Sequence, residues 1–370
     1  MSRPTTMAAI TESREAVRQL SCRVNGEPVQ LDLPDDSELT LLDVLRDFLG
    51  ITSPKNGCQP QAQCGCCTVL MEGKPVLACA LAPSKAEGKS ITTLEGLDEE
   101  HRQQIAESFV RCGGVQCGFC IPGMAMRAVG LCERNTTPTH DEIATALKPH
   151  LCRCTGYAQV VDSIEMYARL RRGEPNVAAS FQDADGSGNV GTNLPRYTGH
   201  EAVLGDRKFI DDMTVPGMLY GAVRLADHPR AKVLAIDPTP ALALEGVHRV
   251  VTAADVPGER YVGLIERDWP VFVAVDEETR CTGDIIAGVV ADNQRLARKA
   301  AQLIDIEYEV LQPVTDPNEA LKPGAPLVHP ERGTNLLSKS VLKRGDVEEA
   351  FRRSAHVIED TYYTQRIEHL

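Results

Sequence analysis

The sequence predicts a multidomain α+β protein, and three observations support this fold class. Residues 20–97 contain two strand pairs around one helical stretch, whereas residues 98–173 show helical periodicity throughout. Residues 199–312 alternate short strands with helices. The chain has 370 residues, which is enough for two to three domains with separate hydrophobic cores.

The segment 20–97 predicts a small mixed domain. The stretch "SCRVNGEPVQLDL" predicts a hairpin because Asn25-Gly26 supplies the positive φ values that a two-residue turn needs. Residues 39–50 carry apolar side chains at helical spacing and end at a glycine. After a cysteine-rich loop, a second hairpin turns at Glu72-Gly73, and "SITTLEGL" predicts a last strand. This order of elements is the layout of a β-grasp ferredoxin.

The segment 98–173 predicts four helices that bury one shared core. The expected helices cover residues 98–112, 122–134, 139–151 and 158–172. Pro122 stands at a first-turn position, where its missing N–H is harmless. Thr139 and Glu142 have the spacing of a capping box.

The remaining segments divide by composition. Residues 1–19 form an N-terminal extension without the apolar core of an export signal, which predicts a cytoplasmic location. Residues 174–198 are rich in Gly, Ser, Asp, Asn and Pro and predict a linker. Residues 199–312 predict an α/β domain, and residues 313–370 become irregular.

Charge and cysteine content narrow the classes of function. The net charge of −13 argues against nucleic acid or an anionic membrane as a partner, and we find no apolar run near 18 residues. Twelve of the thirteen cysteines precede residue 155. In a reducing cytosol this density favours metal binding over structural disulfides.

The first cysteine set has five, two and eleven residues between its members, which are Cys58, Cys64, Cys67 and Cys79. A [2Fe–2S] centre needs four thiolates, three from one loop and a fourth from a neighbouring element. Gly57 and Gly65 let the backbone approach the sulfurs closely. Zinc, which also accepts four thiolates, is the alternative. Cys66 could replace Cys67 as a ligand, although we expect Cys66 to be a free thiol.

The second cysteine set consists of a C-x2-C pair and a C-x-C pair with 31 residues between them, namely Cys117, Cys120, Cys152 and Cys154. Each pair stands just before a predicted helix. Helix N-termini present free N–H groups and positive dipole ends, which stabilise a thiolate-bound cluster. Zinc again stays open, but C-x-C fits the usual spacing of zinc ligands poorly.

Together these motifs resemble the xanthine dehydrogenase/aldehyde oxidoreductase family of molybdenum hydroxylases. The resemblance is carried by "GCQPQAQCGCCTVL", by "AC" at 78–79, by "GGVQCGFCIPGM" and by "LCRCTGY". Residues 205–233 and 283–311 are similar to the family's hammerhead domain. The resemblance covers about residues 20–370 and implies a β-grasp [2Fe–2S] ferredoxin domain, a four-helix [2Fe–2S]-binding domain and an α/β hammerhead domain.

The resemblance also implies a function for each cysteine set. Both sets would hold [2Fe–2S] clusters, and Gln116 and Cys154 would contact a molybdopterin held mainly by a partner chain. Electrons from molybdenum would pass through the second set to the first, and then to a flavin subunit or another acceptor. A purine, another N-heterocycle or an aldehyde would be hydroxylated, with water supplying the oxygen.

Three departures from the family pattern qualify this interpretation. The gap between Cys58 and Cys64 exceeds the family's usual four residues, and the match of "CGCCTVL" to "CGxCTVL" favours Cys67 as the ligand. No FAD domain separates the helical segment from the hammerhead segment. In family members the molybdenum domains begin after a stretch like "QRIEH", so we expect the catalytic domains on another polypeptide.

Two other interpretations of the chain's function stay open. The chain could be a free-standing two-cluster ferredoxin-like carrier or a truncated hydroxylase fragment, in which case no molybdenum partner accompanies it. A zinc-stabilised scaffold is the non-redox alternative, and metal content separates it from the others.

Overall fold

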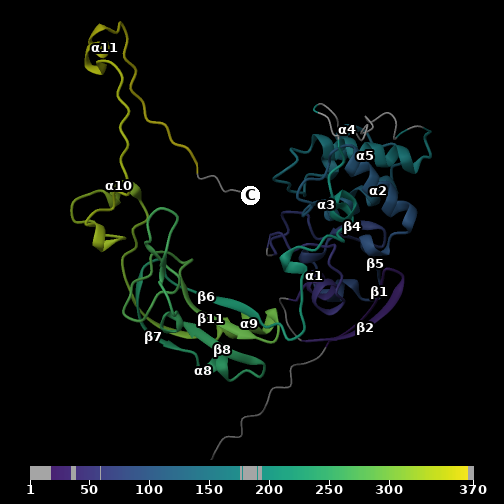
Figure 1. Ribbon diagram of the computed structural model, residues 1–370, viewed down its shortest axis with the longest axis horizontal. Coiled ribbons are helices and arrows are strands. Elements are labelled where there is room, and N and C mark those ends of the chain that lie inside the picture. The colour runs from purple at the N-terminus through teal and green to yellow at the C-terminus, as the bar shows by residue number, and fades with distance from the viewer. Residues whose placement is uncertain are drawn as a thin grey trace, which may run out of the picture. The chain divides into compact units, whose positions relative to one another are not determined.

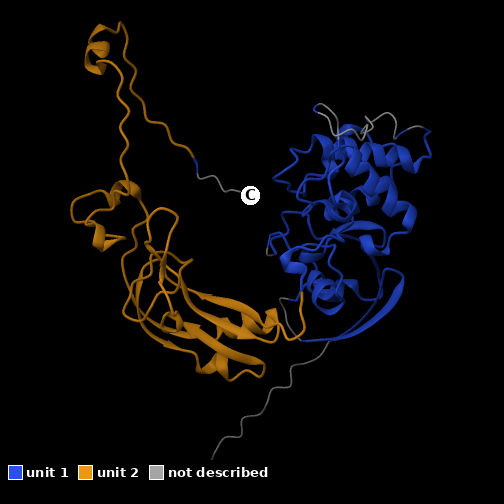
Figure 2. Cartoon of the chain, in the orientation of Figure 1, with its two compact units in different colours: residues 1–213, 365–370 blue, residues 214–364 orange. Residues whose placement is uncertain are grey.

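A computed structural model describes residues 18–34, 39–58, 60–175, 177, 190 and 194–365. The chain divides into two compact units, residues 1–213 with 365–370 and residues 214–364 (Figure 2). Most of the predicted extension 1–19 and of the predicted linker 174–198 lies outside the described residues. The predicted segment boundaries stay predictions.

Two antiparallel hairpins build the sheet of the first unit (Figure 1). Strands β1 (Arg18–Val24) and β2 (Glu27–Leu33) form one, and β3 (Thr68–Met71) and β4 (Lys74–Leu77) form the other. Both turns fall on the predicted dipeptides, whose four residues all have positive φ. The two predicted hairpins are confirmed.

A short strand joins the hairpins into one five-stranded sheet. Strand β5 (Ser90–Thr92) pairs parallel with β1 and antiparallel with β3, giving the order β2-β1-β5-β3-β4. Short 3-10 turns complete this part, namely η2 (Ala78–Ala80), η3 (Pro83–Ala86) and η4 (Leu94–Gly96). Cys67 and Cys79 are buried in the core beneath the sheet.

The helix predicted at 39–50 is present but changes pitch along its length. It begins as α1 (Leu41–Asp43), where Thr40 and Asp43 form a reciprocal capping box, and continues as the π-helix η1 (Val44–Phe48). The wider turn is visible in the hydrogen bond from Leu49 N to Val44 O. Periodicity predicts such an element but not its pitch, because the same residues are buried in either form.

The four predicted helices are all present in the first unit. They are α2 (Glu99–Arg111), α3 (Ile121–Cys132), α4 (His140–Ala146) and α5 (Ala158–Arg171). Pro122 lies in the first turn of α3, and the predicted capping box opens α4. Two further elements, α7 (Gly199–Leu204) and η5 (Ile210–Asp212), were not predicted.

The core of the helical part extends into the cysteine loop of the sheet part. Phe109, Met124 and Ile164 are fully buried at its centre. Cys64 and Cys66 belong to this core together with Cys120, the residue before α3. The loop that precedes β3 is therefore packed on both sides, by the sheet core and by the helical core.

The described part of the second unit contains three small sheets, and its longest helix is α9. Its longer strands are β6 (Tyr220–Leu225), β7 (Ala231–Asp237), β8 (Val247–Thr252), β11 (Ile285–Ala291) and β12 (Asp305–Val310). Strands pair in the orders β6-β11-β8 and β12-β7, and β9 (Tyr261–Val262) pairs with β10 (Trp269–Pro270). Helix α9 (Gln294–Gln302) buries its alanines against this core.

Short elements complete the second unit. These are α8 (Thr239–Leu242), η6 (Ala253–Asp255), α10 (Pro317–Ala320), η7 (Pro330–Arg332) and α11 (Val347–Arg353). The segment predicted to be irregular, 313–370, thus holds three short helical turns in its described part. No helix in the described part of the chain combines the length and the apolar character that a bilayer crossing needs.

Candidate iron–sulfur centres

The hairpin β3–β4 brings two members of the first cysteine set together. Cys67 directly precedes β3, and Cys79 lies in η2 directly after β4. Just beyond the last paired residues of this hairpin, Ala78 N donates to Cys67 O at 3.2 Å, and Cys79 N donates to Cys67 Sγ at 3.5 Å. Two cysteines with eleven residues between them therefore form one contacting pair.

The loop before β3 supplies the other pair of the first set. Cys58 and Cys64 are hydrogen-bonded through their side chains, and Cys58 also reaches Cys79. Gln61 N donates to Cys58 Sγ at 3.2 Å. A Cβ on Gly57 would lie only 3.0 Å from Cys64 Sγ, so glycine is required for the backbone to pass this close to the sulfur.

Hydrogen bonds between thiols lower the pKa of two members of the first set. The pKa of Cys64 falls to about 5, chiefly because Cys66 donates a hydrogen bond to its sulfur. The pKa of Cys79 falls to about 7, chiefly through the hydrogen bond from Cys67. The donating thiols, Cys66 and Cys67, have raised pKa values because of these bonds and of burial. Since the thiolate is the metal-binding form, Cys64 and Cys79 are prepared for ligation.

The second cysteine set is assembled at the start of two helices. Cys120 is the residue before α3, and Cys152 and Cys154 lie in the loop that leads into α5. Side-chain hydrogen bonds pair Cys120 with Cys152 and Cys117 with Cys154. Cys120 is buried and Cys152 half-buried, whereas Cys117 and Cys154 are exposed. The second set therefore runs from the core to the surface.

The environment of Cys152 favours its thiolate form. Its pKa falls to about 5, first because Cys120 donates a hydrogen bond and then because Thr155 donates through its hydroxyl and its N–H. The hydroxyl of Thr155 lies 3.1 Å from Cys152 Sγ. Tyr157, in the left-handed conformation, accepts from Cys152 N at 2.9 Å and donates to His150 O at 3.1 Å. Side chains on both sides thus fix this short loop.

The two cysteine sets are joined by direct backbone contact. Leu151 N donates to Cys64 O at 3.0 Å, which links a residue next to Cys152 with a member of the first set. Gly65 and Gly123 make this approach possible. A Cβ on Gly65 would lie 2.5 Å from Pro149 O, and one on Gly123 would lie 2.4 Å from Gly65 O. The loops are therefore packed without room for a single additional carbon.

The two residues expected to contact a pterin are adjacent on the surface. Gln116 Nε2 donates to Cys154 O at 3.1 Å, and both residues are exposed. The exposed position of Gln116 and Cys154 suits a contact with a cofactor that other residues bind.

Comparison with known proteins gives two matching family models. Residues 93–165 match a [2Fe-2S] binding domain, and residues 204–312 match the a/b hammerhead domain of aldehyde oxidase and xanthine dehydrogenase. The nicotinate dehydrogenase small FeS subunit of Eubacterium barkeri is 39% identical over 142 residues, which are 38% of this chain and 88% of that subunit. The chain belongs to the aldehyde oxidase and xanthine dehydrogenase family.

Longer relatives in the family match most of the chain. The aldehyde oxidoreductase of Megalodesulfovibrio gigas is 34% identical over 94% of this chain and 40% of its own length. A solved aldehyde oxidoreductase from Desulfovibrio desulfuricans has 30% identity and a TM-score of 0.79, covering 91% of this chain and 38% of that one. The chain thus spans about two fifths of the length of these family members.

The large molybdopterin subunit of the same Eubacterium barkeri nicotinate dehydrogenase also matches. It is 35% identical over 181 residues, which are 49% of this chain and 42% of that subunit. The 370-residue chain is therefore similar in sequence to both the small FeS subunit and the large molybdopterin subunit of that nicotinate dehydrogenase.

The two cysteine sets of the chain fit binuclear iron–sulfur clusters. Among the described residues, no group of three or more His, Cys, Asp or Glu side chains is placed to hold a single metal ion. In the first set Cys58 contacts both Cys64 and Cys79, and Cys79 contacts Cys67, whereas the second set consists of the pairs Cys117–Cys154 and Cys120–Cys152. All thirteen cysteines are free of disulfides. Each cysteine set thus brings four thiols together, which is the number of ligands that a cluster of two irons needs.

Some residues around these centres were missed by sequence reasoning. His150 is buried between the two loops, accepts a hydrogen bond from Arg127 at 3.1 Å and lies against Gly65. Burial and the Arg127 charge lower the pKa of His150 to about 3, so the ring is neutral. A lone histidine beside "LCRC" carries no sequence signal of this role, because Arg127 and Gly65 are distant in the chain.

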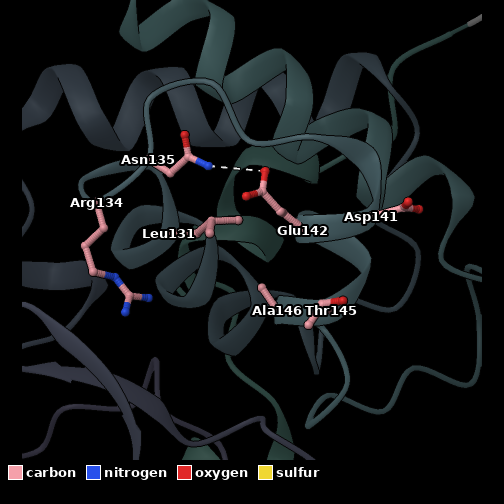
Figure 3. Close-up of a pocket in the computed structure, with 7 residues that line it drawn as sticks. All are labelled: Leu131, Arg134, Asn135, Asp141, Glu142, Thr145 and Ala146. Atoms are coloured by element: carbon pink, nitrogen blue, oxygen red, sulfur yellow. Dashed lines mark hydrogen bonds between the residues drawn. The ribbon is translucent and has the colours of Figure 1, made fainter.

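A separate pocket of about 470 Å³ lies between the end of α3 and helix α4 (Figure 3). Its lining contains no cysteine. Asn135 Nδ2 donates to Glu142 Oε2 at 3.2 Å, and the same carboxylate oxygen accepts from Thr139 N at 2.8 Å. Its polar groups are thus used to cap a helix, and the cysteine loops are the better candidate for function.

Proposed function

We propose that this chain carries two [2Fe–2S] clusters and passes electrons from a molybdopterin centre to an external acceptor. The observation that carries the proposal is the assembly of eight cysteines into two sets of two thiol pairs, joined by the Cys64–Leu151 hydrogen bond. We assign a β-grasp ferredoxin fold to the sheet part, a four-helix cluster-binding fold to the helical part and the hammerhead fold to residues 199–312.

The first cluster would be held by Cys58, Cys64, Cys67 and Cys79. The contact of Cys67 with Cys79 supports Cys67 rather than Cys66 as the third ligand. Cys66 instead donates to Cys64 and belongs to the helical core. The additional residue between Cys58 and Cys64 is accommodated in the exposed part of the loop, where Gln61 N reaches Cys58 Sγ.

The second cluster would be held by Cys117, Cys120, Cys152 and Cys154. When bound, such a cluster accepts and releases one electron at a time. The surrounding residues donate hydrogen bonds to the sulfurs, and Cys120, the partner of half-buried Cys152, is shielded from water. The exposed pair faces the side where Gln116 lies, which supports a donor outside this chain's described residues.

The partner we propose is a molybdopterin-binding catalytic subunit. The shared sequence with a small FeS subunit and a large molybdopterin subunit supports this, as does the similarity to aldehyde oxidoreductases of greater length. The substrate would be an aldehyde, a purine or another N-heterocycle, and the acceptor a flavin subunit or another electron carrier. Thirteen cysteines without a disulfide suit a reducing compartment, which supports a cytoplasmic location.

Replacing Thr155 with valine is expected to lower the reduction potential of the second cluster. The hydroxyl that donates to Cys152 Sγ stabilises the more negative reduced state, and its loss is worth about 20–60 mV if one hydrogen bond contributes about 0.5–1.5 kcal/mol. Potentiometric titration followed by electron paramagnetic resonance measures the shift. Thr145→Val, at an exposed position of α4, is the matched control, and an equal shift in both variants would contradict the assignment.

Replacing Gln116 with alanine is expected to leave both clusters in place and to slow their reduction by the molybdenum centre at least about tenfold. The reason is that the Gln116 amide sets the position of the Cys154 backbone at the exposed edge of the second set. Stopped-flow absorbance of the assembled complex measures the rate. Gln103→Ala, exposed on α2, controls for the loss of a surface amide. An unchanged rate in Gln116→Ala would refute its contact with the pterin.

Native purification under anaerobic conditions tests the partner. A larger companion with near-stoichiometric molybdenum would support the proposal. Iron in this chain without molybdenum or a companion would contradict it in favour of a free-standing carrier, and zinc in place of iron would contradict the cluster assignment itself.

A further inference from the structure

Residues 199–213, which we call the strap, lie across both parts of the first unit. The strap comprises α7, the turn that follows it and η5. It is distant in sequence from both cysteine sets, yet Ala202 and Val203 are buried in the helical core. Its two ends contact different parts of the unit.

The first half of the strap contacts the loop of the second cysteine set. Ala202 packs on Gly118, between Cys117 and Cys120, so closely that a Cβ on Gly118 would lie 2.7 Å from Ala202 Cβ. Arg207 Nη1 donates to Cys117 O at 3.3 Å. Asp206 forms an ion pair with Arg102 of α2 at 3.0 Å. This half is therefore fastened to the helical part.

The second half of the strap contacts the segment that leads into the first cysteine set. Asp212 Oδ2 accepts from Lys55 Nζ at 2.5 Å, and Asp212 Oδ1 lies 2.9 Å from Arg46 Nη2. The turn between α7 and η5 also reaches the sheet part, since a Cβ on Gly205 would lie 2.7 Å from Ser53 Cβ. Lys55 is three residues before Cys58, and its N–H donates to Cys66 O at 3.0 Å. This half is fastened to the sheet part.

Lys55 and Asp212 form a buried ion pair. The side chains are each 1% exposed, and 156 residues separate them in the sequence. A charge in such a place is stable only with its partner, and loss of one partner leaves the other uncompensated. Arg46 differs, because it also donates to Pro54 O and to Asp211, so it keeps partners if Asp212 changes.

An aromatic contact connects the strap with the loop of the second cysteine set. The ring of Phe209 meets that of Phe119 edge to face, with centroids 5.2 Å apart, and Phe119 is the neighbour of Cys120. Lys55 Nζ lies 5.4 Å from the centroid of the Phe209 ring, and the guanidinium of Arg207 lies 5.5 Å from it. The strap thus presents one ring to both cysteine loops.

We propose that the strap is a clamp that fixes the spacing of the two cysteine loops, and that Asp212 is its positioning residue. The spacing of the loops fixes the distance between the clusters, so this role rests on the proposed function. Without the buried ion pair, the Arg46–Asp211 contact and the packing of Gly205 on Ser53 are what remain to hold the strap to the sheet part, so the strap opens more readily while the thiol pairs stay intact. Asp212 touches no thiol: its carboxylate accepts from Lys55 Nζ, pairs with Arg46 and accepts from Phe209 N within the strap.

Three variants test the clamp. Asp212→Asn breaks the buried pair, whereas Asp211→Asn makes the same change of charge at the neighbouring carboxylate, which is 71% exposed. The double variant Lys55→Met/Asp212→Leu replaces the pair by apolar side chains of similar volume, a change that commonly preserves packing. Trypsin cleavage after Arg207 and Lys208 in the metal-free chain reports opening of the strap, and mass spectrometry separates it from cleavage elsewhere. Magnetic interaction between the reduced clusters reports their spacing in the loaded chain.

We expect Asp212→Asn to be cleaved at these sites at least about tenfold faster and to lose the magnetic interaction with its iron content retained. Asp211→Asn and the double variant are expected to behave like the unsubstituted chain. An unchanged cleavage rate, or an unchanged interaction despite faster cleavage, would overturn the clamp. Absence of cluster signals from the unsubstituted chain would contradict the proposed function instead, and the protease experiment would still decide whether the strap is a clamp.

Discussion

Replacing Cys154 with serine is expected to reduce the iron content from about four to about two per chain, because one of two binuclear clusters is lost. Cys154 belongs to an exposed thiol pair, so its loss opens the second set to water while the first set keeps all four thiols. The paramagnetic signal of one cluster should disappear and the other should persist. Iron analysis and spectroscopy of the same sample measure both effects.

Cys66→Ser is the matched control for this experiment. Cys66 is buried next to Cys64 and donates to it, but it is not in either proposed ligand set. We expect about four iron per chain in this variant and a changed signal from the first cluster only. Equal iron loss in the Cys66 and Cys154 variants would show that the ligand assignment is wrong.

Replacing Gly65 with alanine is expected to disrupt the junction of the two cysteine loops. A Cβ would lie 2.5 Å from both His150 Nδ1 and Pro149 O, and Gly65 has a φ of +71°. Crowding and the left-handed conformation together cost about 2–5 kcal/mol of stability. Urea unfolding followed by circular dichroism measures this loss. Weakened magnetic interaction between the clusters should accompany it.

Gly88→Ala separates crowding from backbone strain. Gly88 has a similar φ of +66° but no atom within 4 Å of an added Cβ. The expected cost is therefore only the left-handed term of about 1–2 kcal/mol, with the interaction between clusters unchanged. If the two glycine variants lost equal stability, the packed junction would have no energetic importance.

The local elements of the first unit follow directly from sequence pattern. Turn dipeptides, a capping box and a first-turn proline act within a few residues, and the structure has the hairpins and helices where these signals place them. The cysteine sets could be grouped for a similar reason, since the second consists of two tight pairs and the first of three cysteines in one loop with a fourth on the neighbouring hairpin. Their ligand roles stay predictions.

Other features depend on contacts that no local pattern records. Lys55 and Asp212 look like two surface charges in the sequence, and only the fold buries them together. The pairing of β7 with β12, about seventy positions later, is likewise a contact that no local pattern records. The strap was missed because its contacts with Gly118 and Ser53 require both parts of the unit to be folded.

The most direct test of two binuclear clusters in this chain is anaerobic reduction of the purified protein, monitored by electron paramagnetic resonance with spin quantitation. With two binuclear clusters we expect two distinguishable signals that each integrate to about one spin per chain, since each cluster takes up one electron. A single signal of about one spin, or a silent sample containing zinc, would contradict it.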